Sequence, residues 1–169
     1  MIFAATQCDS PTYCAPNPFV KVNPNMEKIV VGCDHGGFAL KEILKKTLQI
    51  RQFDVIDVGC HDKSSVDYPD IGRLAVEKVL SGICRRGILI CGTGIGMSIF
   101  ANRYRGIRAT LCNDHLSARL SREHNNSNFL VLGGRILGDV LATDIMETWL
   151  ETEFQGNRHQ SRLDRIDEI

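Results

Sequence analysis

The 169-residue sequence predicts an α/β protein, a Rossmann-like three-layer α/β/α sandwich with a five-stranded, mostly parallel sheet. Two observations support this fold class. From Lys28 onward, five short apolar runs alternate with stretches whose apolar residues recur at three- and four-residue spacing. Strands separated by helices imply parallel pairing, with helices on both faces of the sheet. The length suits one domain with a sizeable core.

Each element follows from its own residues. The run IVVGCD predicts a strand over 29–34, and FALKEILKKTLQ has the spacing of an amphipathic helix over 38–49. The runs DVIDVG and GILIC predict strands over 54–59 and 87–91, separated by a polar loop over 64–70 and a helix over 71–80. The remaining strands are predicted over 107–112 and 129–134, and the remaining helices over 95–103, 115–124 and 137–152.

The first 25 residues differ in composition from the rest of the chain. They hold four of the five prolines, and their first basic residue is Lys21. They lack the early positive charge and apolar core of a signal peptide, and the arginines of a mitochondrial presequence. We therefore expect 1–25 to be a poorly ordered extension and 26–169 to be the folded domain.

Charge and cysteine content narrow the function classes. Twenty basic and twenty acidic residues cancel, so nothing indicates a nucleic acid or an acidic membrane as a partner. Seven cysteines without CxxC pairs argue against a disulfide framework and for a reducing compartment. No apolar run approaches the roughly 20 residues of a membrane span. These features predict a cytoplasmic protein. Cys60 and His61 have no partner pair at zinc-ligand spacing, so no metal is predicted.

Three short segments fall at the carboxyl ends of predicted strands, where open α/β sheets bind their ligands. They are 33–35, with Asp34 and His35, 91–93, which begins with Cys91, and 133–135, which ends with Arg135. Because these ends meet at one edge of a parallel sheet, the three segments can share one cleft.

The segment ILICGTGIGMSI at 88–99 places Cys91 directly before a glycine-rich loop that opens a helix. Backbone amides at such a position favour an anion, and the helix field lowers the pKa of a nearby thiol. Walker, cysteine-phosphatase and dinucleotide loops all require a different residue at Met97. From these residues alone, Cys91 is either a small core residue or a reactive thiol above an anion-binding loop.

Further motifs accompany this loop in a fixed order: GCDHGG, DYP at 67–69, SREHNNSN at 121–128, GGR at 133–135 and RHQSR at 158–162. Together they resemble the type B ribose-5-phosphate isomerases, a family that also includes allose-6-phosphate and galactose-6-phosphate isomerases. The resemblance covers about 27–169. It implies interconversion of ribose 5-phosphate and ribulose 5-phosphate, in the non-oxidative pentose phosphate pathway, through ring opening and an enediolate.

The resemblance also implies roles for individual residues. Cys91 matches the catalytic base, and Thr93 with the amides of Gly92, Gly94, Ile95 and Gly96 matches the anion hole. His124 matches the residue that opens the sugar ring. Substrate contacts are implied for Asp34, His35, Tyr68 and Asn125.

A phosphate clamp is implied by three arginines, Arg135, Arg158 and Arg162, of which the last two are four residues apart and share a helix face. In the family, the C-terminal arginines reach the neighbouring subunit's site. The resemblance therefore implies a homodimer with shared active sites, with tetramers in some members, and no cofactor. The alternatives are an isomerase of a six-carbon sugar phosphate and a non-catalytic module that binds a sugar phosphate.

Overall fold

A computed structural model describes residues 26–168, so the predicted extension at 1–25 lies outside the described residues. The chain forms one five-stranded sheet in the order β2-β1-β3-β5-β4, and every neighbouring pair is parallel. The predicted fold class is confirmed, with the sheet parallel throughout. Its strands are β1 (Lys28–Cys33), β2 (Asp54–Asp57), β3 (Arg86–Cys91), β4 (Ala109–Leu111) and β5 (Phe129–Gly133).

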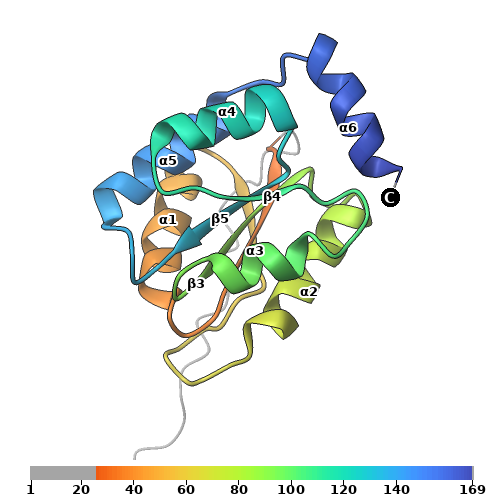
Figure 1. The fold of residues 1–169 in the computed structure, drawn as a ribbon. Coiled ribbons are helices and arrows are strands. Elements are labelled where there is room, and N and C mark those ends of the chain that lie inside the picture. The colour runs from red at the N-terminus through yellow and green to blue at the C-terminus, as the bar shows by residue number, and fades with distance from the viewer. Residues whose placement is uncertain (1–25, 169) are drawn as a thin grey trace, which may run out of the picture.

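Helices cover both faces of the sheet, as Figure 1 shows. One face carries α1 (Phe38–Ile50), α4 (His115–Asn125) and α5 (Asp139–Glu151), and the other carries α2 (Tyr68–Leu80) and α3 (Ile95–Ala101). A short 3-10 turn, η1 (Asn157–His159), leads into the C-terminal helix α6 (Gln160–Asp167). In Figure 1, α6 stands beside the three layers and covers neither face of the sheet.

Alternation along the strands builds two cores. In β1, Ile29 and Val31 pack toward α1, whereas Val30 packs toward α2 and α3. The first core includes the fully buried Trp149 of α5, whose Nε1 donates to the Ser127 hydroxyl at 3.2 Å. The second includes Met97 of α3, also fully buried. Met97 is therefore a core residue. It stands at the position where the Walker, cysteine-phosphatase and dinucleotide loops would each require a different residue.

Two predicted boundaries differ from the structure for identifiable reasons. The helix predicted from 71 begins at Tyr68, because Pro69 occupies the first helical turn, where its missing N–H costs nothing. The strand predicted over 107–112 covers only Ala109–Leu111. Its start is set by Asn102, whose side chain bonds both backbone groups of Ala109, at 2.9 and 2.8 Å.

A buried lysine joins α1 to the segment after β2. Lys41 is fully buried, and its Nζ donates to both carboxylate oxygens of Asp57 at 2.8 Å and to the Cys60 carbonyl at 2.9 Å. Beside this network the sulfurs of Cys33 and Cys60 lie 3.5 Å apart, and burial raises the pKa of both thiols. The network therefore fixes the loop that borders the end of β1. Among residues 26–168, no helix is long and apolar enough to cross a bilayer.

Candidate active site

Cys91 ends β3, the central strand, and only 4% of the residue is exposed. Its Sγ accepts a hydrogen bond from the Gly94 amide at 3.1 Å. The buried thiol of Cys91 therefore lies against an amide of the glycine-rich loop that follows it. A backbone donor thus points at the atom on which negative charge would form if the thiol lost its proton.

The loop at 92–96, called here the glycine loop, needs glycine at two positions. Gly94 has a left-handed φ of 81°, and a Cβ on it would lie 2.4 Å from the Leu111 side chain. A Cβ on Gly96 would lie 2.7 Å from the Tyr68 ring, so that ring rests directly on the loop. Thr93 Oγ1 accepts weakly from the Ile95 amide at 3.4 Å. Only a loop without these side chains lets Tyr68 and a ligand approach its backbone.

The end of β1 lies against the glycine loop. Asp34 is buried, and its carboxylate accepts from the Gly37 amide at 3.0 Å. A Cβ on Gly36 would lie 3.1 Å from the Gly92 Cα, so the two loops touch through their backbones. His35 Nδ1 accepts from the Val66 amide at 3.4 Å, which leaves its Nε2 as the donor in a neutral ring.

The end of β5 completes this edge of the sheet. The Arg135 amide donates to the Gly92 carbonyl at 3.0 Å, and the Gly134 amide donates to the Cys91 carbonyl at 2.8 Å. The Arg135 side chain runs along the loop, since its Cδ lies 3.7 Å from where a Cβ on Gly92 would be. The structure thus brings one group of predicted residues together, called here the thiol cluster: Asp34, His35, Tyr68, the glycine loop with Cys91, and Arg135.

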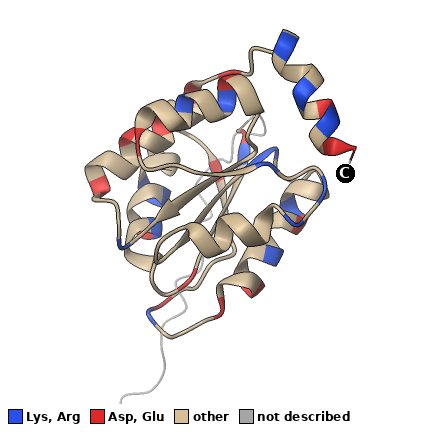
Figure 2. Cartoon of the chain, in the orientation of Figure 1, with Lys and Arg blue, Asp and Glu red and all other residues tan. Residues whose placement is uncertain are grey.

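The other predicted residues lie elsewhere. His124 is in the last turn of α4, and its imidazole stacks on that of His159, with ring centroids 4.2 Å apart and planes 8° apart. Arg158 Nε donates to His159 Nε2 at 3.4 Å. Figure 2 shows blue segments recurring along the tail, where Arg158 and Arg162 are both exposed. This second group, called here the tail cluster, consists of His124, Asn125, Arg158, His159 and Arg162.

His159 is the member of the tail cluster that the sequence prediction missed. It is only 5% exposed, and burial, followed by the positive charges of His124, Arg158 and Arg162, lowers its pKa. The available signal was its place inside RHQSR, between two arginines already expected to hold phosphate.

The two clusters lie at opposite ends of the sheet. The α4 helix begins just after β4, at the carboxyl edge that holds Cys91, and ends just before β5, at the amino edge. Its 11 residues span about 16 Å at 1.5 Å per residue. Within one chain, the thiol cluster and the tail cluster therefore lie toward opposite ends of α4.

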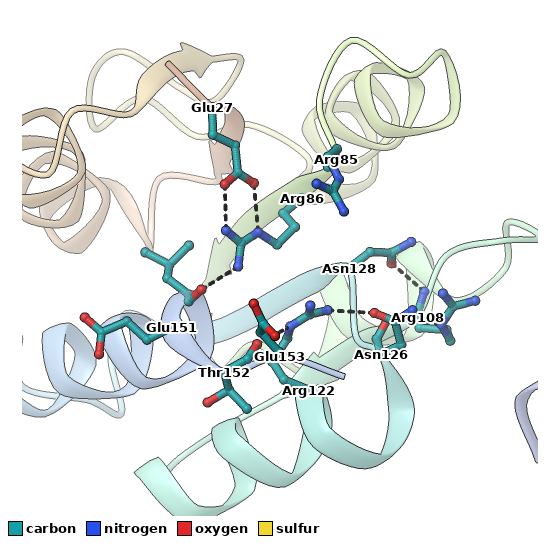
Figure 3. Close-up of a pocket in the computed structure, with 11 residues that line it drawn as sticks. Glu27, Arg85, Arg86, Arg108, Arg122, Asn126, Asn128, Glu151, Thr152 and Glu153 are labelled. Carbon is teal, nitrogen blue, oxygen red and sulfur yellow. Dashed lines mark hydrogen bonds and ion pairs between the residues drawn. The ribbon is translucent and has the colours of Figure 1, made fainter. Parts of the chain in front are cut away.

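A cavity of about 400 Å³ at the amino edge holds four arginines, Arg85, Arg86, Arg108 and Arg122 (Figure 3). Three of them bond groups of the protein itself. Arg86 donates to both Glu27 oxygens and to the Leu150 carbonyl, and Arg122 donates to the Thr152 and Ser127 carbonyls. Arg108 bonds the Asn126 carbonyl.

These carbonyls belong to the C-terminal ends of α4 and α5, where the helix dipoles are negative. Burial, with the neighbouring arginine charges, lowers the pKa of Arg122 to about 10. The arginines therefore cap two helices, and this cavity is a structural junction. The thiol cluster is the better candidate for chemistry.

Known proteins match almost the whole described chain. The protein titled ribose-5-phosphate isomerase B of Escherichia coli is 44% identical over 144 residues, which are 85% of this chain and 97% of that protein. The Clostridium thermocellum ribose-5-phosphate isomerase B structure is 53% identical, with a TM-score of 0.82 and coverage of 83% of this chain and 95% of that one. The Mycoplasma genitalium enzyme, solved with bound ribulose 5-phosphate, is 38% identical, with a TM-score of 0.80 and coverage of 83% and 94%. A profile described as Ribose/Galactose Isomerase matches residues 29–166. This chain belongs to the ribose/galactose isomerase family.

Proposed function

We propose that this protein interconverts D-ribose 5-phosphate and D-ribulose 5-phosphate, with Cys91 as the base. Family membership and the relatives named ribose-5-phosphate isomerase B support the aldose–ketose isomerase activity. The observation that carries the role of Cys91 is its sulfur, 3.1 Å from a loop amide, at the end of the central strand. Chemistry of this kind needs a base next to donors that hold the developing oxyanion.

The reaction requires two stages. The furanose ring must first open to give the aldehyde. The Cys91 thiolate then removes the proton from C2, and the negative charge moves onto the C1 oxygen as an enediolate. The hydroxyl proton on O2 passes to O1, and the Cys91 thiol returns its proton to C1, which gives the C2 ketone and restores the thiolate. In this proposal, the amides of the glycine loop and the Thr93 hydroxyl hold the enediolate oxygens, and Asp34, His35 and Tyr68 bind the sugar.

The tail cluster supplies the other parts of the site from a second chain. His124 opens the ring, Asn125 binds the sugar, and Arg158 and Arg162 hold the phosphate together with Arg135 of the chain that carries Cys91. The separation of the clusters along α4 supports this arrangement, because each chain holds two complementary halves. A two-fold homodimer would then contain two complete sites. A tetramer would pair two such dimers.

We also propose a cytoplasmic location and a role in the non-oxidative pentose phosphate pathway. The five described cysteines are all free, including Cys33 and Cys60 in direct contact, which is what a reducing compartment maintains.

The test is to incubate the purified protein with ribose 5-phosphate and to follow the appearance of ribulose 5-phosphate. Cys91→Ala should abolish turnover and retain binding of the phosphate ligand. The matched control is Cys84→Ala, a buried cysteine just before the amino end of β3, which should retain activity. Removal of a group that transfers a proton should cause a large loss of turnover. More than a few per cent of wild-type turnover in Cys91→Ala would therefore exclude Cys91 as the base.

Two other outcomes distinguish the alternatives. Faster turnover of allose 6-phosphate or galactose 6-phosphate than of ribose 5-phosphate would indicate a six-carbon substrate. Ligand binding without turnover, in protein whose Cys91 is confirmed reduced, would indicate a binding module.

A further inference from the structure

His159 is a buried polar residue that is assigned no contact with the substrate. It is separated from His124 by 35 positions in sequence, yet the two rings are stacked and nearly parallel, 8° apart. A ring packed face to face against another cannot turn about its Cβ–Cγ bond without collision. His159, 95% buried, therefore fixes the plane of His124, which is itself only half-buried.

The contacts of His159 favour the neutral form of its ring over the doubly protonated, charged form. Two stacked imidazolium rings would repel each other, and this repulsion disfavours the protonated form of His159. Arg158 Nε donates to His159 Nε2, so that nitrogen must present a lone pair, and the proton of the neutral ring is on Nδ1.

The surroundings of His159 favour its neutral form. Burial and the positive charges of His124 on α4 and of Arg158 and Arg162 in the tail all lower its pKa, and Glu123 opposes them only weakly. His159 is therefore the neutral member of the pair, and its part in the proposed reaction is to hold His124 rather than to transfer a proton.

The contact with Arg158 extends this unit to the phosphate clamp. Arg158 uses Nε toward His159, and the residue is exposed, so the other end of its guanidinium is accessible. A phosphate held by that end would therefore be in fixed register with the imidazole plane of His124. Catalysis depends on the alignment of the catalytic group with the bound substrate, so a small displacement of either one lowers the reaction rate strongly.

We propose that His159 is a positioning residue for ring opening: its neutral imidazole holds the plane of His124 and links that ring to Arg158 of the phosphate clamp. This inference rests on the proposed function, because it assigns His159 to one stage of that reaction. It does not make His159 a group that touches the substrate.

The test compares the two directions of the reaction. Ribose 5-phosphate is a furanose that must open, whereas ribulose 5-phosphate cannot form a furanose. His159→Ala should lower kcat from ribose 5-phosphate about tenfold or more, and change kcat from ribulose 5-phosphate by about twofold at most. His159→Phe retains a flat ring beside His124 but loses the acceptor for Arg158, so it should recover only part of the forward kcat. Gln160→Ala, an exposed neighbour in the same tail, is the matched control and should behave as the wild type.

A further variant identifies the step. His124→Ala should show the same difference between directions, and adding His159→Ala to it should cause little further loss, because both changes act on one event. Equal loss of kcat in both directions for His159→Ala and His159→Phe would reduce His159 to a structural role, and an unchanged forward kcat would also overturn the proposal. If the wild-type protein converts neither substrate, the proposed function itself fails, which is a distinct result.

Discussion

Mixing two inactive variants should restore activity if the site is shared between chains. Cys91→Ala removes the base from the thiol cluster, and Arg158→Ala removes a phosphate ligand from the tail cluster. Because about 16 Å of α4 separates the two clusters within one chain, each variant leaves one half of its own surface intact. A dimer with one chain of each kind would combine the intact halves in one of its two sites.

The expected recovery follows from this count. Loss of the charge-assisted bonds of Arg158 to phosphate costs about 1.5–3 kcal/mol, which is a roughly tenfold to 150-fold loss of activity. Without exchange of chains, an equal mixture of the two variants would thus give about 5% of wild-type activity at most, because only the Arg158→Ala half of the mixture retains any activity. After random exchange, about half of the dimers are mixed and each has one complete site, so the activity should reach about a quarter of the wild type.

The assay is turnover of ribose 5-phosphate after the mixed variants are unfolded and reassembled, with exchange verified by mass-tagged chains. The matched control replaces Arg158→Ala by Arg135→Ala. Arg135 contacts the glycine loop of its own chain, so no dimer of that pair with Cys91→Ala contains a complete site. Verified exchange without recovery for the first pair would refute the shared site. Equal recovery for both pairs would refute the assignment of Arg135 and Arg158 to different clusters.

Three further predictions follow from individual contacts. Gly94→Ala should lose activity and at least about 1–2 kcal/mol of stability, because the left-handed φ of Gly94 is combined with overlap of the new Cβ with Leu111. Gly82→Ala is the control, since Gly82 has a φ of 75° but open space around it. In the same urea titrations it should lose stability, and its activity should not change. Lys41→Met should cost roughly 2–3 kcal/mol, less than a fully broken buried pair because Lys45 still bonds Asp57; an unchanged urea midpoint would contradict this. The lowered pKa of His159 means that the unfolded chain binds protons more readily below about pH 6.5. Stability should therefore fall as the pH drops below that value, and His159→Phe should weaken this dependence in thermal melts at a series of pH values.

The sequence predicts the fold well because two independent periodicities agree. Apolar runs such as 87–91 are buried on both faces, and helices such as α1 have one apolar side, so the alternation leaves one architecture. Boundaries were less accurate where single contacts decide them. The bonds from Asn102 to Ala109 and the tolerance of the first helical turn for Pro69 are tertiary and local details that periodicity does not contain.

The thiol cluster was accessible from sequence because parallel strands end at one edge. Asp34, Cys91 and Arg135 each follow a strand, and the structure places them around one loop. The order of the strands was not predicted. His159 was missed because a stack between rings 35 positions apart depends on how the tail turns back onto α4, where the Gln155 amide donates to the Glu123 carbonyl at 3.0 Å.

The composition of the tail supports the proposal that two chains form each site. Among the described residues from 157 onward, the chain buries mainly His159 and Leu163. This tail joins the body of the chain through the stack of His159 on His124 and through the ion pair of Arg108 with Asp167 at 3.3 Å. Two buried residues and one partly exposed ion pair are enough to direct a short helix, but they bury little apolar surface for its length. Arg158 and Arg162 are left exposed in this tail, whose His159 contacts the C-terminal end of α4. In the proposed arrangement, these two guanidinium groups do not bind the substrate that the thiol cluster of their own chain holds. They suit an anion brought by another copy, which is the relation that a two-fold dimer provides.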